Sequence, residues 1–135
     1  MIETKNLTRH YGQLVAVQDL DLEVRAGELF GFLGPNGAGK TTTLRMLIGL
    51  LRPTSGTARV AGHDVQLASR QAKRATGYLP DAPYLYDKLT GREHLGFVGG
   101  LYGLTDGAVE SRVARLLALV ELQDRAGDLI ETYSH

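Results

Sequence analysis

The stretch that decides the fold is GPNGAGKTT, residues 34–42. It fits the pattern G-x-x-x-x-G-K-S/T, in which glycines let the backbone wrap closely around an anion and point successive N–H groups inward. An ordinary glycine-rich turn is the alternative, although average residue usage gives such a match by chance about once in a few hundred chains of this length. The pattern predicts a nucleotide-binding loop made of Gly34, Pro35, Asn36, Gly37, Ala38, Gly39, Lys40, Thr41 and Thr42.

The residues on either side of this loop are typical of a strand and a helix that hold phosphate between them. LFGFL, residues 29–33, is apolar on both faces, as a strand buried in a parallel sheet should be. A helix over about 39–50 follows, and its positive N-terminal end would face the phosphates. We expect Lys40 to reach the β and γ phosphates and the Thr41 hydroxyl to hold the magnesium ion that bridges them.

Composition limits the classes of function. Fifteen basic residues balance fifteen acidic ones, so no net field favours nucleic acid, and nucleic acid is not expected as a partner. The absence of cysteine fits a reducing compartment. The longest apolar runs, such as 46–51, fall far short of the roughly 18 residues of a membrane span, and the N-terminus has no secretory signal pattern. We expect a soluble protein that reaches a membrane only through a partner.

The rest of the chain divides into a strand-rich first part and a helical second part. Turn residues Gly12 and Gln13 separate two segments, 3–11 and 14–24, whose pattern predicts an antiparallel pair. The other expected elements are strands at 57–62 and 76–80, a short helix at 69–75, a helix from Thr90 through Tyr102 with a Thr90–Glu93 capping box and weakening glycines, and a helix over 109–120 capped by Asp106.

Tyr11 is the candidate for contact with a nucleotide base. It lies upstream of the loop in HYGQLVAV, and an aromatic face is what adenine stacking requires. The alternative is a strand tyrosine that packs on the core, which the residue by itself favours. Together with the other motifs of the chain, Tyr11 favours stacking on a base over packing in the core.

Three segments together resemble the nucleotide-binding domain of ATP-binding cassette (ABC) proteins: HYGQLVAV, residues 21–65, and GYLPDAPYLYDKLTGREHL. The likeness runs over residues 1–135 and is greatest to the branch that drives bacterial multidrug and natural-product exporters. It implies an α/β P-loop NTPase fold, present in part, with an antiparallel β subdomain, an incomplete and mainly parallel core sheet, and the start of a helical subdomain. It implies a single partial domain: β subdomain and P-loop core in 1–80, a Q-loop-like segment in 81–87, and the helical subdomain in 88–135.

The resemblance also assigns roles to single residues. Residues 34–42 would be the Walker A motif, and Tyr11 the aromatic residue that stacks on adenine. Asp81 occupies the position of a glutamine that touches magnesium and the attacking water, so Thr41 and Asp81 are the implied magnesium ligands. An aspartate is shorter and lacks the amide donor, which leaves a solvated loop aspartate as the alternative.

The last five residues, ETYSH, resemble the approach to the family's signature motif, L-S-G-G-Q. Ser134 would contact the γ phosphate of ATP held by a partner subunit; the alternative is a helix-ending Tyr-Ser-His without a role. The resemblance places the Walker B aspartate, the catalytic glutamate and the switch histidine beyond His135. We therefore expect an interrupted chain without a complete catalytic set, which binds ATP and Mg²⁺ at best and does not turn ATP over.

The whole protein implied by this resemblance is the ATP-binding subunit of an ABC transporter, an ATP hydrolase that couples ATP binding and hydrolysis to export. Its implied partners are a transmembrane permease subunit and a second nucleotide-binding domain in a head-to-tail dimer. Its implied location is cytoplasmic, at the inner face of the cell membrane, where the permease holds it as a peripheral subunit. The alternative is a soluble ABC ATPase that acts on ribosomes or repair complexes.

Overall fold

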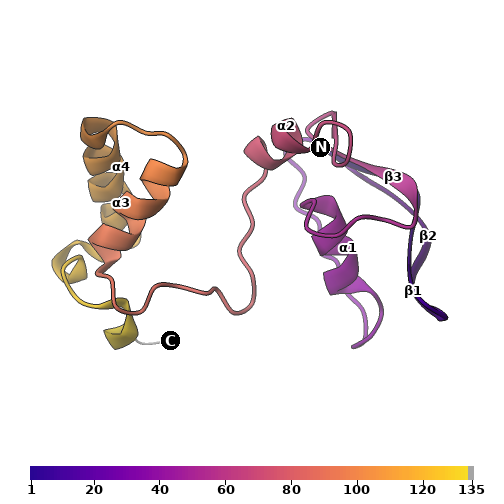
Figure 1. Ribbon diagram of the computed structural model, residues 1–135, viewed down its shortest axis with the longest axis horizontal. Helices are drawn as coiled ribbons and strands as arrows, with labels where there is room; N and C mark the ends of the chain where they lie inside the picture. Colours follow the sequence, from indigo (N-terminus) through magenta and orange to yellow (C-terminus); the bar gives the residue numbers. More distant parts are fainter. Residues whose placement is uncertain (134–135) are drawn as a thin grey trace. The chain divides into compact units, whose positions relative to one another are not determined.

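The computed structural model describes residues 1–133, which fall into two compact units divided between Leu79 and Pro80 (Figure 1). No helix in these residues has the length and apolar content needed to cross a membrane. The first unit contains β1 (Ile2–Tyr11), β2 (Leu14–Val24), α1 (Lys40–Leu47), β3 (Ser55–Val60), β4 (His63–Asp64) and α2 (Ser69–Arg74). The second contains α3 (Gly91–Leu101), α4 (Asp106–Leu119) and two 3-10 helices, η1 (Gln123–Arg125) and η2 (Ile130–Thr132).

The sheet of the first unit is built on the predicted hairpin. β1 and β2 pair antiparallel, and Tyr11 and Leu14 are the last pair before the turn. Gly12 has φ +57° in that turn, a left-handed conformation that glycine accepts readily. The strand order is β2-β1-β3-β4, and every pair is antiparallel. The prediction of an antiparallel β subdomain is confirmed.

Helix α1 packs against this sheet and holds the preceding loop in place (Figure 1). Its buried residues, Thr43, Met46 and Leu47, recur at the spacing of one helix face. Burial of a side chain such as Met46 contributes about 1.5–3 kcal/mol, so the contact anchors the helix firmly. Met46 and Leu47 share a core with Leu7, Val17, Ala58, Val60, Val65 and Ala72.

The predicted helix over 39–50 ends earlier than expected. The regular part of α1 stops at Leu47, because Gly49 takes φ +69°, which a right-handed helix cannot contain. The predicted strand at 57–62 is β3, shifted toward the N-terminus, and the predicted helix at 69–75 is α2.

The two predicted parallel strands are wrong for the described residues. Neither 29–33 nor 76–80 is a strand, and the sheet in residues 1–133 is antiparallel throughout. Leu29 and Leu33 are almost fully exposed, while the rings of Phe30 and Phe32 lie 6.4 Å apart. A parallel strand is stable only between paired neighbours and with both faces covered, and the described residues supply neither condition. The α/β class therefore rests on the antiparallel sheet and the helices.

The second unit begins with a helix whose N-terminus is fully capped. The Thr90 hydroxyl accepts a hydrogen bond from the Glu93 N–H, and the Glu93 carboxylate accepts one from the Thr90 N–H at 2.8 Å, which confirms the predicted capping box. The Thr90 N–H, and secondly its hydroxyl, lower the pKa of Glu93 by stabilising the carboxylate. The Arg92 N–H donates to the Ala126 carbonyl at 3.0 Å. Protein groups thus satisfy the first turn of α3.

Helix α4 starts one residue away from the predicted cap. Thr105, with φ −75° and ψ 155°, holds the N-cap position, so Asp106 is the first helical residue and makes no side-chain cap bond. The extended conformation of Thr105 is the one that a residue before a helix adopts, which leaves no capping role for Asp106. Val113 and Leu117 are buried on the inner face of α4, in a core with Ala126.

Tyr133 is held against the beginning of α3. Its hydroxyl donates to the Arg125 carbonyl at 2.8 Å, and the Arg125 guanidinium carbon lies 4.9 Å from the centroid of its ring. Gly91 contacts the same hydroxyl so closely that a Cβ at position 91 would overlap it. The chain just before residue 134 is therefore fixed to the second unit at a defined point.

Candidate functional site

The loop of residues 34–39 has the conformation that its glycines predict. Gly37 and Gly39 have φ +85° and +80°, in the left-handed region where a side chain is strained. The Ala38 N–H donates to the Pro35 carbonyl at 3.2 Å, which folds the loop back on itself. The segment then enters α1 directly at Lys40.

The end of the loop packs on a bulge in β2. The register between β1 and β2 shifts after Arg9, which leaves Ala16 as an extra residue. A Cβ on Gly39 would overlap the Ala16 carbonyl oxygen and press on the Val17 side chain, so only glycine allows this approach. The contact places the end of the loop beside the hairpin in which β1 ends at Tyr11.

The N-terminus of α1 presents unpaired donors. Among residues 1–133, no acceptor bonds the backbone N–H groups of Lys40, Thr41 and Thr42, whereas protein groups bond those of the first turn of α3. The first turn carries no acidic residue, and Gly39 supplies no capping side chain. The positive end of the helix dipole, equivalent to about half a charge, is thus uncompensated. Free N–H groups and a positive dipole end together suit an anion such as phosphate.

Lys40 adds a full positive charge to the same place. Its ammonium group donates to the carbonyls of Gly34 and Pro35, at 2.6 and 2.7 Å, and so lies across the loop. In the described part of the chain no carboxylate is within ion-pair distance of it. The ammonium group, the helix N–H groups and the exposed Thr41 hydroxyl form a donor set that fits the phosphates of a nucleotide.

Tyr11 does not pack in the core. Its side chain is 43% exposed at the end of β1, which disagrees with the core-tyrosine alternative. The guanidinium carbon of Arg9 lies 4.6 Å from the centroid of its ring. No motif in the sequence marks Arg9, but residues two apart on a strand share a face, so its spacing from Tyr11 is the signal that indicates this contact.

The remaining predicted site residues, Asp81 and Ser134, are not part of the first unit, which holds the loop. Asp81 is exposed, in a segment without regular structure that belongs to the second unit. Its role as a magnesium ligand with Thr41 stays a prediction. Ser134 lies outside the described residues, so its role in a signature motif also stays a prediction.

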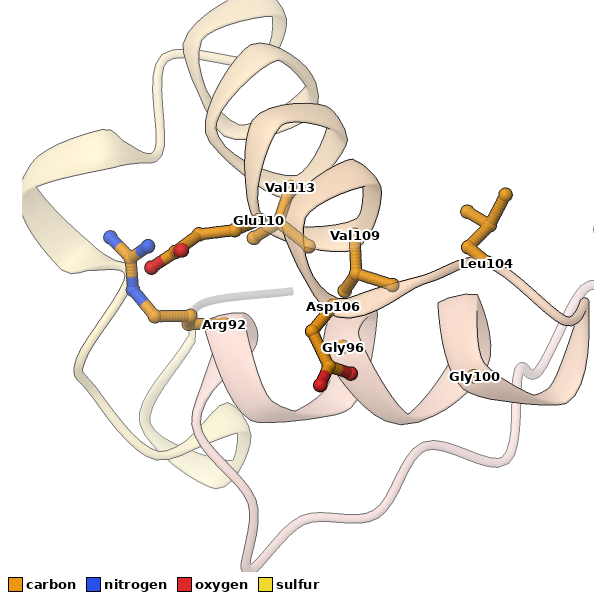
Figure 2. A pocket seen from close by; sticks show the side chains of 8 residues that line it. All are labelled: Arg92, Gly96, Gly100, Leu104, Asp106, Val109, Glu110 and Val113. Carbon is orange, nitrogen blue, oxygen red and sulfur yellow. The ribbon is translucent and has the colours of Figure 1, made fainter.

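The second unit has an open groove of about 400 Å³ between α3 and α4 (Figure 2). Figure 2 shows the side chains of Arg92 and Glu110 directed toward each other at one end of it. None of the residues predicted for nucleotide or magnesium lines this groove. Its walls are formed by Arg92, Gly96, Gly100, Leu104, Asp106, Val109, Glu110 and Val113.

Comparison with known proteins connects this geometry to one family. Residues 17–135 match the ABC transporter family. The linearmycin resistance ATP-binding protein LnrL of Bacillus subtilis is 41% identical over 99% of this chain, and the daunorubicin/doxorubicin resistance ATP-binding protein DrrA of Streptomyces peucetius is 44% identical over 98%. A solved structure described as the ATP-binding subunit of an ABC transporter superposes with a TM-score of 0.84 at 32% identity, over 99% of this chain and 56% of its own.

The chain spans 43% of the length of LnrL and 40% of the length of DrrA. Within that span the match covers both the strand-rich first unit and the helical second unit. The structural match extends the agreement from the loop motif to the fold as a whole, which confirms the P-loop NTPase class. The chain therefore belongs to the ABC transporter family.

Proposed function

We propose that this chain binds Mg-ATP at residues 34–42 and that the whole protein uses ATP binding and hydrolysis to drive export through a membrane permease. The observation that carries the proposal is the phosphate loop, whose glycines open the backbone ahead of a helix with unpaired N–H groups. The relatives LnrL and DrrA are both named as resistance ATP-binding proteins, which supports export over a role on ribosomes or repair complexes.

Each residue of the site has a defined task in this proposal. The N–H groups at the start of α1 bind phosphate oxygens, and Lys40 donates to the β and γ phosphates. The Thr41 hydroxyl is a ligand for magnesium, which bridges the phosphates and neutralises their charge. Because phosphoryl transfer depends mainly on positioning and electrostatics, these residues prepare the nucleotide for reaction.

Tyr11 is proposed to stack on adenine. Tyr11→Ala should weaken Mg-ATP binding by about 1–3 kcal/mol, because stacking on an aromatic face is worth that amount. Tyr11→Phe and Tyr11→Trp keep the face and should change the affinity little. Titration calorimetry on the three variants measures this, and equal affinities for all of them would remove Tyr11 from the base site.

Asp81 is proposed to bind magnesium, directly or through water. Nucleotide affinity should then depend more steeply on Mg²⁺ concentration in the natural protein than in Asp81→Ala, because a carboxylate ligand is lost. Asp106→Ala, at another exposed carboxylate of the second unit, is the matched control. Superimposable magnesium titrations of the natural protein and Asp81→Ala would make Asp81 a solvated loop residue.

Catalysis is proposed to need groups that residues 1–135 do not supply. The resemblance assigns the aspartate that supports magnesium and the glutamate that activates water to later positions of the family. Residues 1–135 alone should therefore bind ATP without turnover. An assay of phosphate release checks this, and steady release that Lys40→Ala abolishes would show that these 135 residues suffice.

The proposed partners are those that the resemblance to ABC proteins implies. We propose a head-to-tail dimer in which Ser134 of one chain faces the phosphates held by Lys40 of its partner, with both chains docked on a permease at the inner face of the membrane. Copurification of the gene product from solubilised membranes tests this assignment. A multi-span membrane protein in the eluate supports transport, whereas ribosomal or repair proteins in its place would favour the soluble alternative.

A further inference from the structure

Arg9 is a charged residue beside Tyr11, the proposed base site, and it has no part in the function proposed above. Its guanidinium carbon is 4.6 Å from the centroid of the Tyr11 ring, within the range of a cation–π contact. Its Nη1 atom donates to the Arg52 carbonyl at 3.0 Å. Its Nε atom is buried and has no acceptor among the described residues. The guanidinium group is thus held between the tyrosine ring and one backbone carbonyl.

That carbonyl belongs to the segment that follows α1. Two further hydrogen bonds join this segment to the end of β1: the His10 N–H donates to the Thr54 hydroxyl at 3.0 Å, and the Thr54 N–H donates to the Thr8 carbonyl at 2.8 Å. Helix α1 directly follows the phosphate loop, and its N-terminus is the proposed phosphate site. Arg9 therefore connects the Tyr11 ring, through the segment after α1, to the helix that is proposed to bind the phosphates.

We propose that Arg9 is a positioning residue for the nucleotide base, which covers one face of the Tyr11 ring and fixes the ring so that its other face receives adenine. The inference rests on the proposed function of this site. Tyr11 is 43% exposed even with Arg9 on its ring, so part of the ring is open to a ligand. A side chain that is already fixed loses less conformational freedom when the ligand binds, which strengthens binding.

The test uses two ligands, one with a base and one without, to distinguish binding of the base from binding of the phosphates. Titration calorimetry with Mg-ATP and with magnesium tripolyphosphate, which has no base, is carried out on the natural protein, Arg9→Gln and Arg9→Lys. Arg9→Gln should weaken ATP binding by about threefold to tenfold, the effect of one unfixed side chain, and leave tripolyphosphate binding unchanged. Arg9→Lys keeps the charge but loses the planar group, so its ATP affinity should lie between the two.

A matched control accounts for the change in net charge. Arg70→Gln removes the same charge from α2, where the exposed Arg70 side chain makes no ion pair or ring contact with other described residues. The affinities of Arg70→Gln for Mg-ATP and for magnesium tripolyphosphate should match those of the natural protein. Equal weakening of ATP and tripolyphosphate by Arg9→Gln would overturn the proposal, because Arg9 would then support the fold and not the base.

A double mutant shows whether Arg9 acts through Tyr11. In a Tyr11→Ala background, Arg9→Gln should cause no further loss of ATP affinity, since the ring that it positions is gone. An undiminished loss in that background would overturn the proposal. Lys40→Ala shows whether the proposed function itself fails. If Lys40→Ala changes the affinity for neither Mg-ATP nor tripolyphosphate, the phosphate assignment is wrong. If Lys40→Ala weakens both and Arg9→Gln weakens neither, only the role of Arg9 is refuted.

Discussion

Lys40→Ala is expected to weaken Mg-ATP binding by about tenfold to 150-fold. The variant removes a charge-assisted contact to phosphate, and such contacts contribute roughly 1.5–3 kcal/mol. The effect should be large because Lys40 has no carboxylate within ion-pair distance in the described chain, so its charge is free for the nucleotide. Titration calorimetry with Mg-ATP gives the two affinities directly.

Lys5→Ala is the control for the loss of a lysine. Lys5 lies on β1, its side chain is largely exposed, and it pairs with Glu3. Its removal should leave ATP affinity and thermal unfolding close to those of the natural protein, because exposed ion pairs contribute little. If Lys40→Ala and Lys5→Ala bind ATP equally well, residues 34–42 are not a phosphate site.

Gly39→Ala is expected to have the second large effect, on both stability and binding. The new Cβ would meet the Ala16 carbonyl, a backbone atom that cannot turn aside, so the loop or the bulge must move. The free energy of unfolding should fall by about 2–5 kcal/mol, the sum of a backbone strain of about 1–2 kcal/mol and an overpacking cost of about 1–3 kcal/mol. ATP affinity should fall as well, because the start of α1 moves with the loop.

Gly37→Ala is the matched variant for this test. Gly37 has a similar left-handed φ, but nothing lies within 4 Å of a Cβ built on it. Its substitution should cost only the backbone strain of about 1–2 kcal/mol. Thermal unfolding of both variants measures the difference, and equal destabilisation would show that the contact between Gly39 and Ala16 does not constrain the loop.

The sequence predicts those parts of the fold whose signals are local. The hairpin turn at Gly12, the capping box of Thr90 and Glu93, and the phosphate loop all depend on residues within a few positions of one another. The hairpin and the capping box are present in the structure, and the loop has the left-handed glycines that its sequence predicts, while its binding of phosphate stays a prediction. Local signals also set the limits of the helices to within a few residues.

The predictions that failed, or that were not made, depend on distant partners. The apolar run at 29–33 indicates a buried strand, but a strand needs neighbours that residues 1–133 do not supply. The contact of Gly39 with Ala16 depends on a bulge in β2, and no pattern in the loop itself reveals it. The contact of Arg9 with Arg52 joins residues 43 positions apart. Such pairings are fixed by tertiary structure.

Because Gly91 fits closely against the Tyr133 hydroxyl, the residue types at these two positions should change together during evolution. An alanine at 91 would push the tyrosine out, and a small residue at 133 would leave the Arg125 guanidinium without its ring. Neither substitution is therefore neutral by itself. In descendants of this gene, tyrosine at 133 should be inherited with glycine at 91, and a larger residue at 91 should accompany a smaller one at 133.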